Sequence, residues 1–374
     1  MPPVVINLRK TEDSRDVVHR AVQTLAEGKL VVFPTETVYG LAASARRADG
    51  VRRIFDAKGR TDDVPLALAI RGVEDALDYA PYLGKKALRL ARRCWPGPVT
   101  LVVDHGEDEG LVRQLPAEVR SLVAPNGTVG LRVPAHPTIQ DVLRMLAGPI
   151  ALTSVNRTGE APAIDAQEAV RSMGSYVGLV IDDGPCRYGQ ASTVVRAGKD
   201  SFDCLREGVV PRSALDRLAS MLVVIVCTGN TCRSPMAEAL MRRLVAERLG
   251  CKPEEVGERG VIISSAGVSA SPGGGAAPDA IETMREHGLD LSRHETQPLN
   301  DKLIRHADLI LTLATGHRQA IVRRWPEAAP RVANLRLDGG DVDDPIGAPA
   351  EVYRQCAQQI EAALRERVNQ MELG

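Results

Sequence analysis

The stretch MLVVIVCTGNTCRSP at residues 221–235 contains three structural signals in one run. Residues 222–226 are apolar and mostly β-branched, and they have the length and composition of a buried parallel strand. A Gly-Asn pair then favours a turn, and Pro235 favours the first turn of a helix, which residues 236–249 continue with apolar side chains at helical spacing. The stretch therefore predicts a strand, a tight loop and a helix.

The loop of this stretch has the composition of an anion-binding site. Backbone N–H groups at the start of a helix bind phosphate, and the loop residues that would supply them are Thr228, Gly229, Asn230, Thr231 and Cys232. Cys227 lies at the base of the loop, where these groups, the helix dipole and the Arg233 guanidinium favour a thiolate. A thiolate can attack phosphorus while Arg233 binds two phosphate oxygens. The pattern predicts a cysteine-dependent phosphatase; the alternative is a buried cysteine beside an unrelated arginine.

The run CTGNTCRSP in this setting resembles the active-site loop of the low-molecular-weight protein tyrosine phosphatases, over residues 221–374. The resemblance implies a doubly wound parallel sheet, a phosphoprotein substrate and no cofactor. It implies that Cys227 is the nucleophile, that Ser234 bonds to its sulfur and helps it to leave, and that Asp344 of an Asp-Pro pair is the general acid. It also implies a protective disulfide between Cys227 and Cys232. Asp341 and Asp343 are alternative acids, which we interpret as solvated loop charges.

Two residues bear on which phosphate this domain removes. The family includes phosphotyrosine and phosphoarginine enzymes, and the loop resembles that of the bacterial protein arginine phosphatases. Thr231 places a hydroxyl where tyrosine-directed members carry a larger aliphatic side chain. Ile346 follows the Asp-Pro pair where those members place aromatic residues. We therefore expect a phosphoarginine phosphatase, with a tyrosine phosphatase as the alternative.

Length predicts two domains, which we interpret as α/β folds. The 374 residues exceed what one core comfortably organises, and we place the domains at residues 1–212 and 221–374. The first carries 28 Lys and Arg against 26 Asp and Glu, and residues 213–374 carry 19 against 22, which opposes non-specific nucleic-acid binding. The seven cysteines are irregularly spaced with no CxxC pair, so we expect neither a disulfide framework nor a structural metal site. No signal peptide or membrane span is evident, and we expect a cytoplasmic protein.

The N-terminal half begins with a helix that Ser14 can cap and Gly28 can end. A strand at residues 30–33 then leads into PTETVYGLAASA, where hydroxyls and a glycine crowd the end of a buried strand, as they do where α/β sheets bind ligands. A second helix at residues 51–57 is followed by Lys58-Gly59-Arg60. Two cations are therefore expected beside a sheet end.

Several motifs follow in a specific order: PTETVYGL, KGR with PLAL, WPGPVTLV, LRVPAHP, TSVNRTG, DDGP and LREG. In this order they resemble the YrdC-like threonylcarbamoyl-AMP synthases across residues 10–210. The resemblance implies a twisted mixed sheet with helices. It also implies synthesis of threonylcarbamoyl-AMP from L-threonine, bicarbonate and ATP, with pyrophosphate released. The product would pass to the tRNA threonylcarbamoyl transferase machinery that forms threonylcarbamoyladenosine.

The candidate residues of this half suit that chemistry. Cations and magnesium neutralise the triphosphate of ATP during transfer. Lys58 and Arg60 are the candidates for the triphosphate, and Ser154 and Asn156 are those for nucleotide and carbamate. The candidates for L-threonine are Thr35, Thr37 and Tyr39. Arg132 and Arg206 are candidates for further phosphate or carboxylate contacts. The alternative is a module that binds double-stranded RNA or tRNA, which the nearly neutral charge disfavours.

Overall fold

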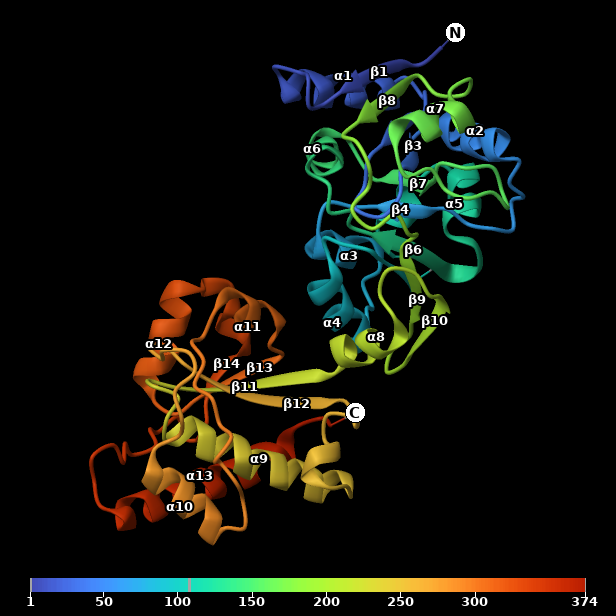
Figure 1. The fold of residues 1–374 in the computed structure, drawn as a ribbon. Coiled ribbons are helices and arrows are strands. Elements are labelled where there is room, and N and C mark those ends of the chain that lie inside the picture. The colour runs from blue at the N-terminus through green and yellow to red at the C-terminus, as the bar shows by residue number, and fades with distance from the viewer. Residues whose placement is uncertain (1, 107–108, 374) are drawn as a thin grey trace. The chain divides into compact units, whose positions relative to one another are not determined.

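The computed structural model describes residues 2–106 and 109–373. The chain folds as two compact units, Met1–Leu218 and Ala219–Gly374 (Figure 1). The segment expected to connect the domains is mostly helical, because α8 covers Arg212–Ala219. Among the described residues, no helix combines the length and apolar character needed to span a bilayer.

The first unit combines one large sheet with helices. Its strands are β1 (Val4–Asn7), β2 (Val31–Phe33), β3 (Gly40–Ser44), β4 (Ala67–Ala69), β5 (Val99–Asp104), β6 (Thr128–Arg132), β7 (Ile150–Ser154), β8 (Leu179–Asp182), β9 (Thr193–Ala197) and β10 (Phe202–Arg206). Its helices are α1 (Ser14–Ala26), α2 (Ala48–Lys58), α3 (Val73–Tyr79), α4 (Lys85–Cys94), α5 (Ala117–Val123), α6 (Pro137–Met145), α7 (Ala166–Met173) and α8, with short 3-10 turns η1 (Leu111–Gln114) and η2 (Pro125–Gly127).

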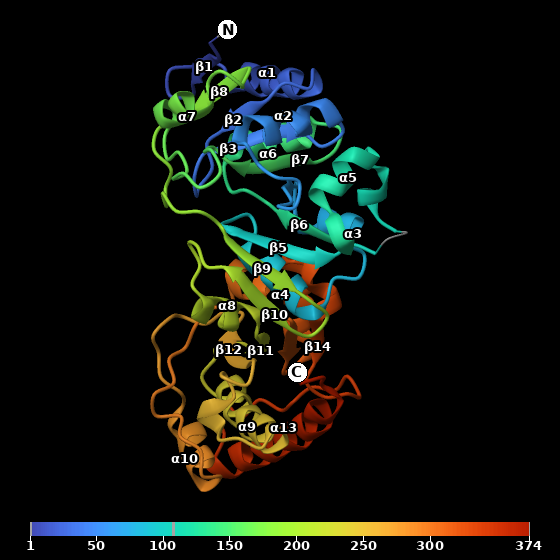
Figure 2. The same ribbon diagram turned by 90° about the vertical axis from the view of Figure 1, so that its right-hand side faces the viewer.

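The ten strands form a mixed sheet in the order β1-β8-β2-β3-β7-β4-β6-β5-β9-β10. The sheet contains both parallel pairs, such as β4 with β6, and antiparallel pairs, such as β3 with β7, and β5, β9 and β10 form one end of it (Figure 2). This arrangement confirms the predicted mixed α/β fold. It also brings the last residues of β6 and β10, Arg132 and Arg206, to one cavity.

Two helix ends in this unit show how local sequence sets the fold. The cap of α1 is Asp13, whose carboxylate accepts from the Arg15 N–H at 2.8 Å. The prediction that Ser14 caps this helix is therefore wrong by one residue, because the Asp13 carboxylate, and not the Ser14 hydroxyl, accepts from a free N–H of the first turn. Helix α2 ends at Lys58, where Gly59 adopts a left-handed conformation with φ 58° that glycine enters without strain.

The second unit has a four-stranded sheet in the order β12-β11-β13-β14, with every neighbouring pair parallel. Its strands are β11 (Met221–Cys227), β12 (Val261–Gly267), β13 (Leu309–Thr312) and β14 (Val332–Asn334). Its helices are α9 (Arg233–Leu249), α10 (Pro278–Glu286), α11 (Asp301–His306), α12 (Thr315–Arg324) and α13 (Ala350–Gln370), with 3-10 turns η3 (Pro253–Glu255) and η4 (Pro326–Arg331). The predicted parallel doubly wound sheet is confirmed.

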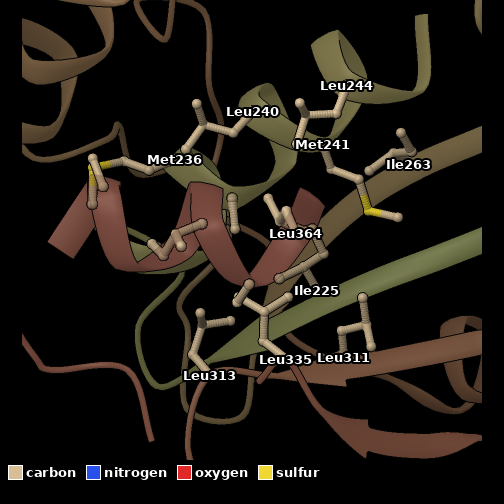
Figure 3. Packing of buried hydrophobic residues seen from close by; sticks show 14 of the residues in the cluster. Ile225, Met236, Leu240, Met241, Leu244, Ile263, Leu311, Leu313, Leu335 and Leu364 are labelled. Atoms are coloured by element: carbon tan, nitrogen blue, oxygen red, sulfur yellow. The ribbon is translucent and has the colours of Figure 1, made fainter. Parts of the chain in front are cut away.

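Apolar side chains cover both faces of this sheet. On one face, residues of β11 pack against α9, α10 and α13, as Figure 3 shows for Ile225, Met236, Leu240 and Leu364. On the other face, Val224 and Val226 pack against α11 and α12. A strand buried on both faces reads as a continuous apolar run, which is why residues 222–226 identified it. The strand holds Cys227 at its carboxyl end, in the middle of the sheet.

Candidate active sites in the two units

A cavity of about 430 Å³ opens in the first unit. The candidate residues that line it are Thr35, Tyr39, Arg60, Arg132, Ser154 and Arg206. Arg196, which the sequence did not single out, lines it as well. Among the described residues of the lining there is no carboxylate, so the charge facing the cavity is positive. Such a cavity favours a polyanion.

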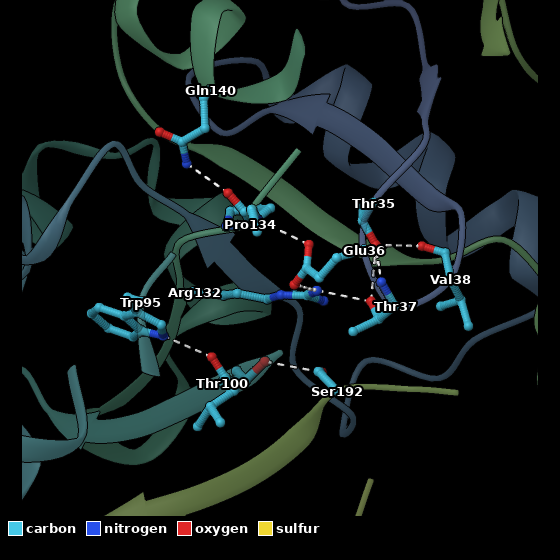
Figure 4. Close-up of polar contacts among 12 residues, drawn as sticks. Thr35, Glu36, Thr37, Val38, Trp95, Thr100, Arg132, Pro134, Gln140 and Ser192 are labelled. Atoms are coloured by element: carbon cyan, nitrogen blue, oxygen red, sulfur yellow. Dashed lines mark hydrogen bonds and ion pairs between the residues drawn. The ribbon is translucent and has the colours of Figure 1, made fainter. Parts of the chain in front are cut away.

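Arg132 occupies the centre of a buried polar cluster (Figure 4). Its Nη2 donates to Glu36 Oε1 at 2.7 Å and to Thr37 Oγ1 at 2.8 Å. The other oxygen of Glu36 accepts from the Ala135 N–H at 2.9 Å. The Arg132 Nε is buried and has no hydrogen-bond partner among the described residues. Sequence reasoning passed over Glu36, although it stands between two candidate threonines in the PTET motif.

Arg60 and Arg206 approach the cavity from the end of α2 and the end of β10. The Arg60 guanidinium donates to the carbonyls of Val64 and Pro65, each at 2.8 Å, and Arg206 Nη2 donates to the Ser192 carbonyl at 2.8 Å. Burial lowers the pKa of Arg60, and the positive charge of Arg206 lowers it further. Burial likewise lowers the pKa of Arg206, with Arg132 adding to the effect. A bound anion would relieve this mutual repulsion.

Lys58 does not line the cavity. Its Nζ donates to the carbonyls of Ser154 at 2.7 Å and Asn156 at 2.6 Å, and to Asn156 Oδ1 at 3.2 Å. Burial lowers the pKa of Lys58 to about 8, with the Arg60 charge as the second cause. The Lys58 ammonium therefore joins the end of β7 to the loop that follows it. In this structure Lys58 orders that loop, and Asn156 in turn accepts from Ser154 Oγ at 2.5 Å.

The three candidates for threonine binding are also engaged with the protein. Thr35 Oγ1 donates to the Val38 carbonyl at 2.6 Å and lies 2.9 Å from Thr37 Oγ1. The Tyr39 hydroxyl donates to the Gly184 carbonyl at 2.8 Å. Burial raises the pKa of Tyr39, so the hydroxyl stays protonated. Tyr39 therefore ties the PTET segment to the turn after β8, while Thr35 faces the cavity wall.

In the second unit, the loop after β11 surrounds the sulfur of Cys227 with hydrogen-bonding groups. Ser234 Oγ lies 3.0 Å from Cys227 Sγ, and the Asn230 N–H donates to the sulfur at 3.3 Å. Helix α9 starts at Arg233, two residues before the predicted Pro235. A proline in the first turn removes an N–H that has no partner within the helix, so the earlier start costs nothing. The Asn230 N–H and Ser234 in the first turn of α9 thus contact the cysteine sulfur.

Asn230 supports the loop from within the protein. It is fully buried and adopts a left-handed conformation with φ 57°, which asparagine tolerates better than most residues. Its Nδ2 donates to Ser234 Oγ and to Ser265 Oγ, both at 2.9 Å. Ser265 lies within β12, so its contact with Asn230 ties the cysteine loop to the neighbouring strand. Further bonds come from the Gln297 N–H to Asn230 Oδ1 at 2.9 Å and from His294 Nε2 to the Asn230 carbonyl at 2.8 Å.

Arg233 and Asp344 form an ion pair across the site. The Arg233 side chain is 7% exposed and that of Asp344 is 44% exposed, so the carboxylate keeps access to solvent. Arg233 Nη1 also donates to the Val342 carbonyl at 3.3 Å. Arg233 and Asp344, which lie 111 residues apart in the sequence, are therefore hydrogen-bonded to each other at the cysteine loop. Asp341 and Asp343 are exposed, as expected, but both have hydrogen-bond partners.

The cysteines separate into two groups. Cys227 and Cys232 are both free thiols and both buried. Cys232 Sγ lies 3.5 Å from the Tyr353 hydroxyl. Burial is the main cause that raises the pKa of Tyr353, and the contact with Cys232 is the second. Outside the loop, Cys94 and Cys356 are buried, whereas Cys186, Cys204 and Cys251 are half-buried.

His317 is a site residue that sequence reasoning missed. Its Nε2 lies 2.9 Å from Thr228 Oγ1 in the cysteine loop, and its Nδ1 is buried without a partner among the described residues. Burial lowers the pKa of His317, and the Arg233 charge is the second cause. A lone histidine in a helix gives no local signal of this contact, because 89 residues separate it from Thr228.

Comparison with known proteins gives a match for each unit. The Sua5/YciO/YrdC family model, described as "Telomere recombination", matches residues 23–208, and the model for low molecular weight phosphotyrosine protein phosphatase matches residues 222–373. A putative threonylcarbamoyl-AMP synthase of Mycobacterium tuberculosis is 34% identical over 211 residues, which are 56% of this chain and 91% of the relative. A protein-arginine-phosphatase of Bacillus subtilis is 39% identical over 156 residues, which are 41% of this chain and 97% of the relative.

Two other comparisons concern proteins of Pyrococcus abyssi. The threonylcarbamoyl-AMP synthase of Pyrococcus abyssi is 34% identical over 215 residues, or 58% of this chain, and the match spans only 60% of the relative. A solved structure of a Pyrococcus abyssi Sua5 variant covers 89% of this chain and 99% of its own, with a TM-score of 0.52 and 25% identity. The chain therefore belongs to two enzyme families, the Sua5/YrdC threonylcarbamoyl-AMP synthases through its first unit and the low-molecular-weight protein phosphatases through its second.

Proposed function

We propose that the first unit synthesises threonylcarbamoyl-AMP from L-threonine, bicarbonate and ATP. The observation that supports this most directly is the cavity that Arg60, Arg132 and Arg206 line without an opposing carboxylate among the described residues. A triphosphate carries negative charge that the Arg60 and Arg206 guanidinium groups lack as a partner, since among the described residues Arg132 alone of the three is paired with a carboxylate, and bidentate contacts would orient its oxygens. Hydroxyls of Thr35 and Ser154 line the same cavity and suit the polar groups of the other substrates.

The threonine amine attacks the carbon of bicarbonate, a C–O bond of bicarbonate breaks and water leaves, and the resulting carbamate oxygen then attacks the α-phosphorus of ATP. The bond from that phosphorus to the bridging oxygen breaks, and pyrophosphate leaves with the electron pair. The arginines would stabilise the negative charge that accumulates on the pyrophosphate. Magnesium, when bound, would neutralise part of this charge; with no carboxylate in the described lining, its ligands would be phosphate oxygens and hydroxyls.

Lys58 and Asn156 act in this proposal as positioning residues. The Lys58 ammonium holds the carbonyls of Ser154 and Asn156, and this fixes the loop that carries the Ser154 hydroxyl into the cavity. The product would be consumed by a threonylcarbamoyl transferase that acts on tRNA, and we infer a cytoplasmic location, where ATP and tRNA are available. These roles make Lys58 important even without a direct phosphate contact.

Pyrophosphate release tests this proposal. We expect release only when L-threonine, bicarbonate, ATP and magnesium are all present, and Arg60→Ala should lower kcat/KM by about 100-fold because a transition-state contact is lost. Lys29→Ala serves as the control that removes a surface cation, since Lys29 pairs with exposed Glu27 outside the cavity. Release that does not depend on threonine, or an unchanged Arg60→Ala protein, would refute the assignment.

We further propose that the second unit is a cysteine-dependent phosphatase. The Cys227 thiolate would attack phosphorus while Arg233 and the loop N–H groups hold the phosphate oxygens. Asp344 would give its proton to the leaving atom as the bond from phosphorus breaks, and a water would then hydrolyse the thiophosphate with Asp344 as the base. The pairing of Ser234 Oγ with Cys227 Sγ at 3.0 Å supports a stabilised sulfur leaving group.

Phosphoarginine is the substrate we propose for this site. Thr231 carries a hydroxyl on the loop, Ile346 is 69% exposed next to the acid loop, and the Bacillus subtilis relative is a protein-arginine-phosphatase. A polar contact suits a guanidinium, and the site has no aromatic residue at position 346 for a phenyl ring.

Catalytic efficiency on phosphoarginine and phosphotyrosine peptides tests this choice. The parent should prefer phosphoarginine and Thr231→Ile should reduce that preference; a parent that prefers phosphotyrosine, or a ratio unchanged by the substitution, would contradict it.

A further inference from the structure

The loop that carries Asp344 is attached to the rest of the second unit at each of the three preceding residues. Asp341 Oδ1 accepts from the Thr315 N–H at 2.7 Å and from Thr315 Oγ1 at 2.8 Å. The Val342 N–H donates to the Leu313 carbonyl at 2.8 Å. Asp343 Oδ2 accepts from Gln359 Nε2 at 2.8 Å. The two acidic residues that precede Asp344 therefore contact different helices, Asp341 the start of α12 and Asp343 the helix α13.

The helix that binds Asp341 also contacts the cysteine loop. Thr315 is the first residue of α12, and its Oγ1 accepts from Asn334 Nδ2 at 3.1 Å, which fixes the hydroxyl. Two residues later, His317 lies 2.9 Å from Thr228 in the cysteine loop. The first turn of α12 thus connects the loop that carries the acid with the loop that carries the nucleophile. A rigid turn of helix can hold two loops at a constant separation.

Asp344 itself has little that would hold it in place during the reaction. Its side chain pairs with Arg233, and its Oδ1 accepts from the Ile346 N–H at 3.3 Å within the same loop. A phosphoryl group bound in the cysteine loop competes for the Arg233 guanidinium, so the ion pair is weakened when substrate is present. The position of the carboxyl group then depends on the attachments of the neighbouring residues.

We propose that Asp341 is a positioning residue for the general acid, and that it acts by anchoring the loop of Asp344 to Thr315 at the start of α12. This inference rests on the proposed phosphatase function. Asp341 is not an alternative acid, because both donors of Thr315 are directed at its carboxylate and stabilise the ionised form. The backbone bond from Thr315 is the largest cause that lowers the pKa of Asp341. Proton transfer requires hydrogen-bond reach, and a displacement of about 1 Å can cost about 100-fold in rate.

The dependence on leaving group separates positioning of the acid from damage to the site. Phenyl phosphate releases a basic phenoxide that needs the proton, whereas 2,4-dinitrophenyl phosphate releases an anion that does not. For Asp341→Ala we expect kcat/KM to fall about 100-fold on phenyl phosphate and by less than about threefold on 2,4-dinitrophenyl phosphate. Asp341→Asn should retain most activity on both substrates, because its Oδ1 can still accept from both Thr315 donors.

The chain offers a matched control in Asp290. This exposed carboxylate accepts from the Ser292 N–H at 2.8 Å and from Ser292 Oγ at 3.0 Å, and bonds from Ser292 lower its pKa too. It therefore reproduces the Asp341 motif in the turn between α10 and α11. Asp290→Ala should leave both rates unchanged. If Asp341→Ala does not fold, Thr315→Val takes its place. It keeps the N–H bond to Asp341 and removes the hydroxyl, which donates to Asp341 and accepts from Asn334 Nδ2, and it should give a smaller loss confined to phenyl phosphate.

Three results would overturn the inference. Equal losses on the two substrates in Asp341→Ala or Thr315→Val would mean that Asp341 supports the whole site rather than the acid. Unchanged activity on phenyl phosphate would mean that the loop needs no anchor at α12. A parent protein that hydrolyses neither the aryl phosphates nor a phosphoarginine peptide would instead refute the proposed phosphatase function, and the inference with it; activity of the parent on 2,4-dinitrophenyl phosphate distinguishes this case from the first two.

Discussion

Arg132 and Glu36 form an ion pair at 2.7 Å in which each side chain is only 9% exposed. Removing one partner of a buried pair leaves an uncompensated charge and is strongly destabilising. We expect Glu36→Ala to lower the free energy of unfolding by about 3 kcal/mol in urea denaturation. Glu36→Gln keeps an acceptor for Arg132 and should lose less. Glu27→Ala, which breaks an exposed pair with Lys29, should change the free energy of unfolding little. Equal losses in Glu36→Ala and Glu27→Ala would show that the buried pair contributes no more to stability than the exposed one.

The pKa of Lys58, lowered to about 8, predicts a pH dependence of the synthase. The charged ammonium donates to the carbonyls of the Ser154 loop, and it loses a proton as the pH rises through about 8. We therefore expect kcat/KM for ATP to fall above this pH, since that parameter reports ionisations of the free enzyme. Lys58→Arg should move the fall beyond the accessible range. A parent profile that stays flat from about pH 7 to about 9.5 would exclude this role for Lys58.

The same pKa has a consequence for stability. The folded-state pKa of Lys58 lies below the unfolded value of 10.5, so between about 8 and 10.5 the unfolded chain binds more protons than the folded one. Burying the ammonium destabilises the first unit fully below about pH 8, and this cost disappears as the pH rises toward 10.5. In Lys58→Met the unfolding free energy should lack this upward trend. An identical pH dependence in both proteins would contradict the lowered pKa.

Ser234 should matter most for the second step of the phosphatase. Its hydroxyl lies 3.0 Å from Cys227 Sγ and can donate to the thiolate that departs when the thiophosphate is hydrolysed. A hydrogen bond to a charged group contributes about 1.5–3 kcal/mol, so Ser234→Ala should slow hydrolysis of the thiophosphate by about 10- to 100-fold. Rapid mixing with p-nitrophenyl phosphate should then show a burst of the first product. Slow turnover without a burst would place the effect in the first step instead.

Oxidation tests the relation between the two thiols of the cysteine loop. Cys227 and Cys232 are both reduced and buried in one loop, and we expect peroxide to form a disulfide between them before any sulfinic acid. Mass spectrometry of the oxidised protein measures the linkage, and reduction should restore phosphatase activity. Cys356→Ser serves as a control that keeps both loop thiols. If Cys232→Ser regains activity after peroxide as fully as the parent does, the protective role is wrong.

The cysteine loop could be predicted from sequence because its parts are contiguous. Residues 221–235 contain the strand, the turn and the helix start, and local rules identify each of them. The synthase candidates needed the order of motifs as well, and in the structure Arg60, Arg132 and Arg206 line one cavity. It could not predict that the donors of Lys58 turn to backbone carbonyls, because a side-chain rotamer depends on the packed loop around it.

Contacts between distant segments set the limit of prediction. Thr228 and His317 lie 89 residues apart, and Asp341 and Thr315 lie 26 apart, and neither pair has a spacing that indicates contact. Both depend on how α12 packs beside β13, which local propensity does not determine. Sequence therefore identified the groups suited to the chemistry, whereas the residues that position them emerged only from the fold.

The most direct test of two active sites on one chain is a paired assay of the full-length protein with Arg60→Ala and Cys227→Ser. Each protein is assayed for threonine-dependent pyrophosphate release and for hydrolysis of p-nitrophenyl phosphate. We predict that the parent shows both activities, that Arg60→Ala loses most of the first and keeps the second, and that Cys227→Ser keeps the first and loses the second. Pyrophosphate release without threonine, or phosphatase activity that survives Cys227→Ser, would contradict the account.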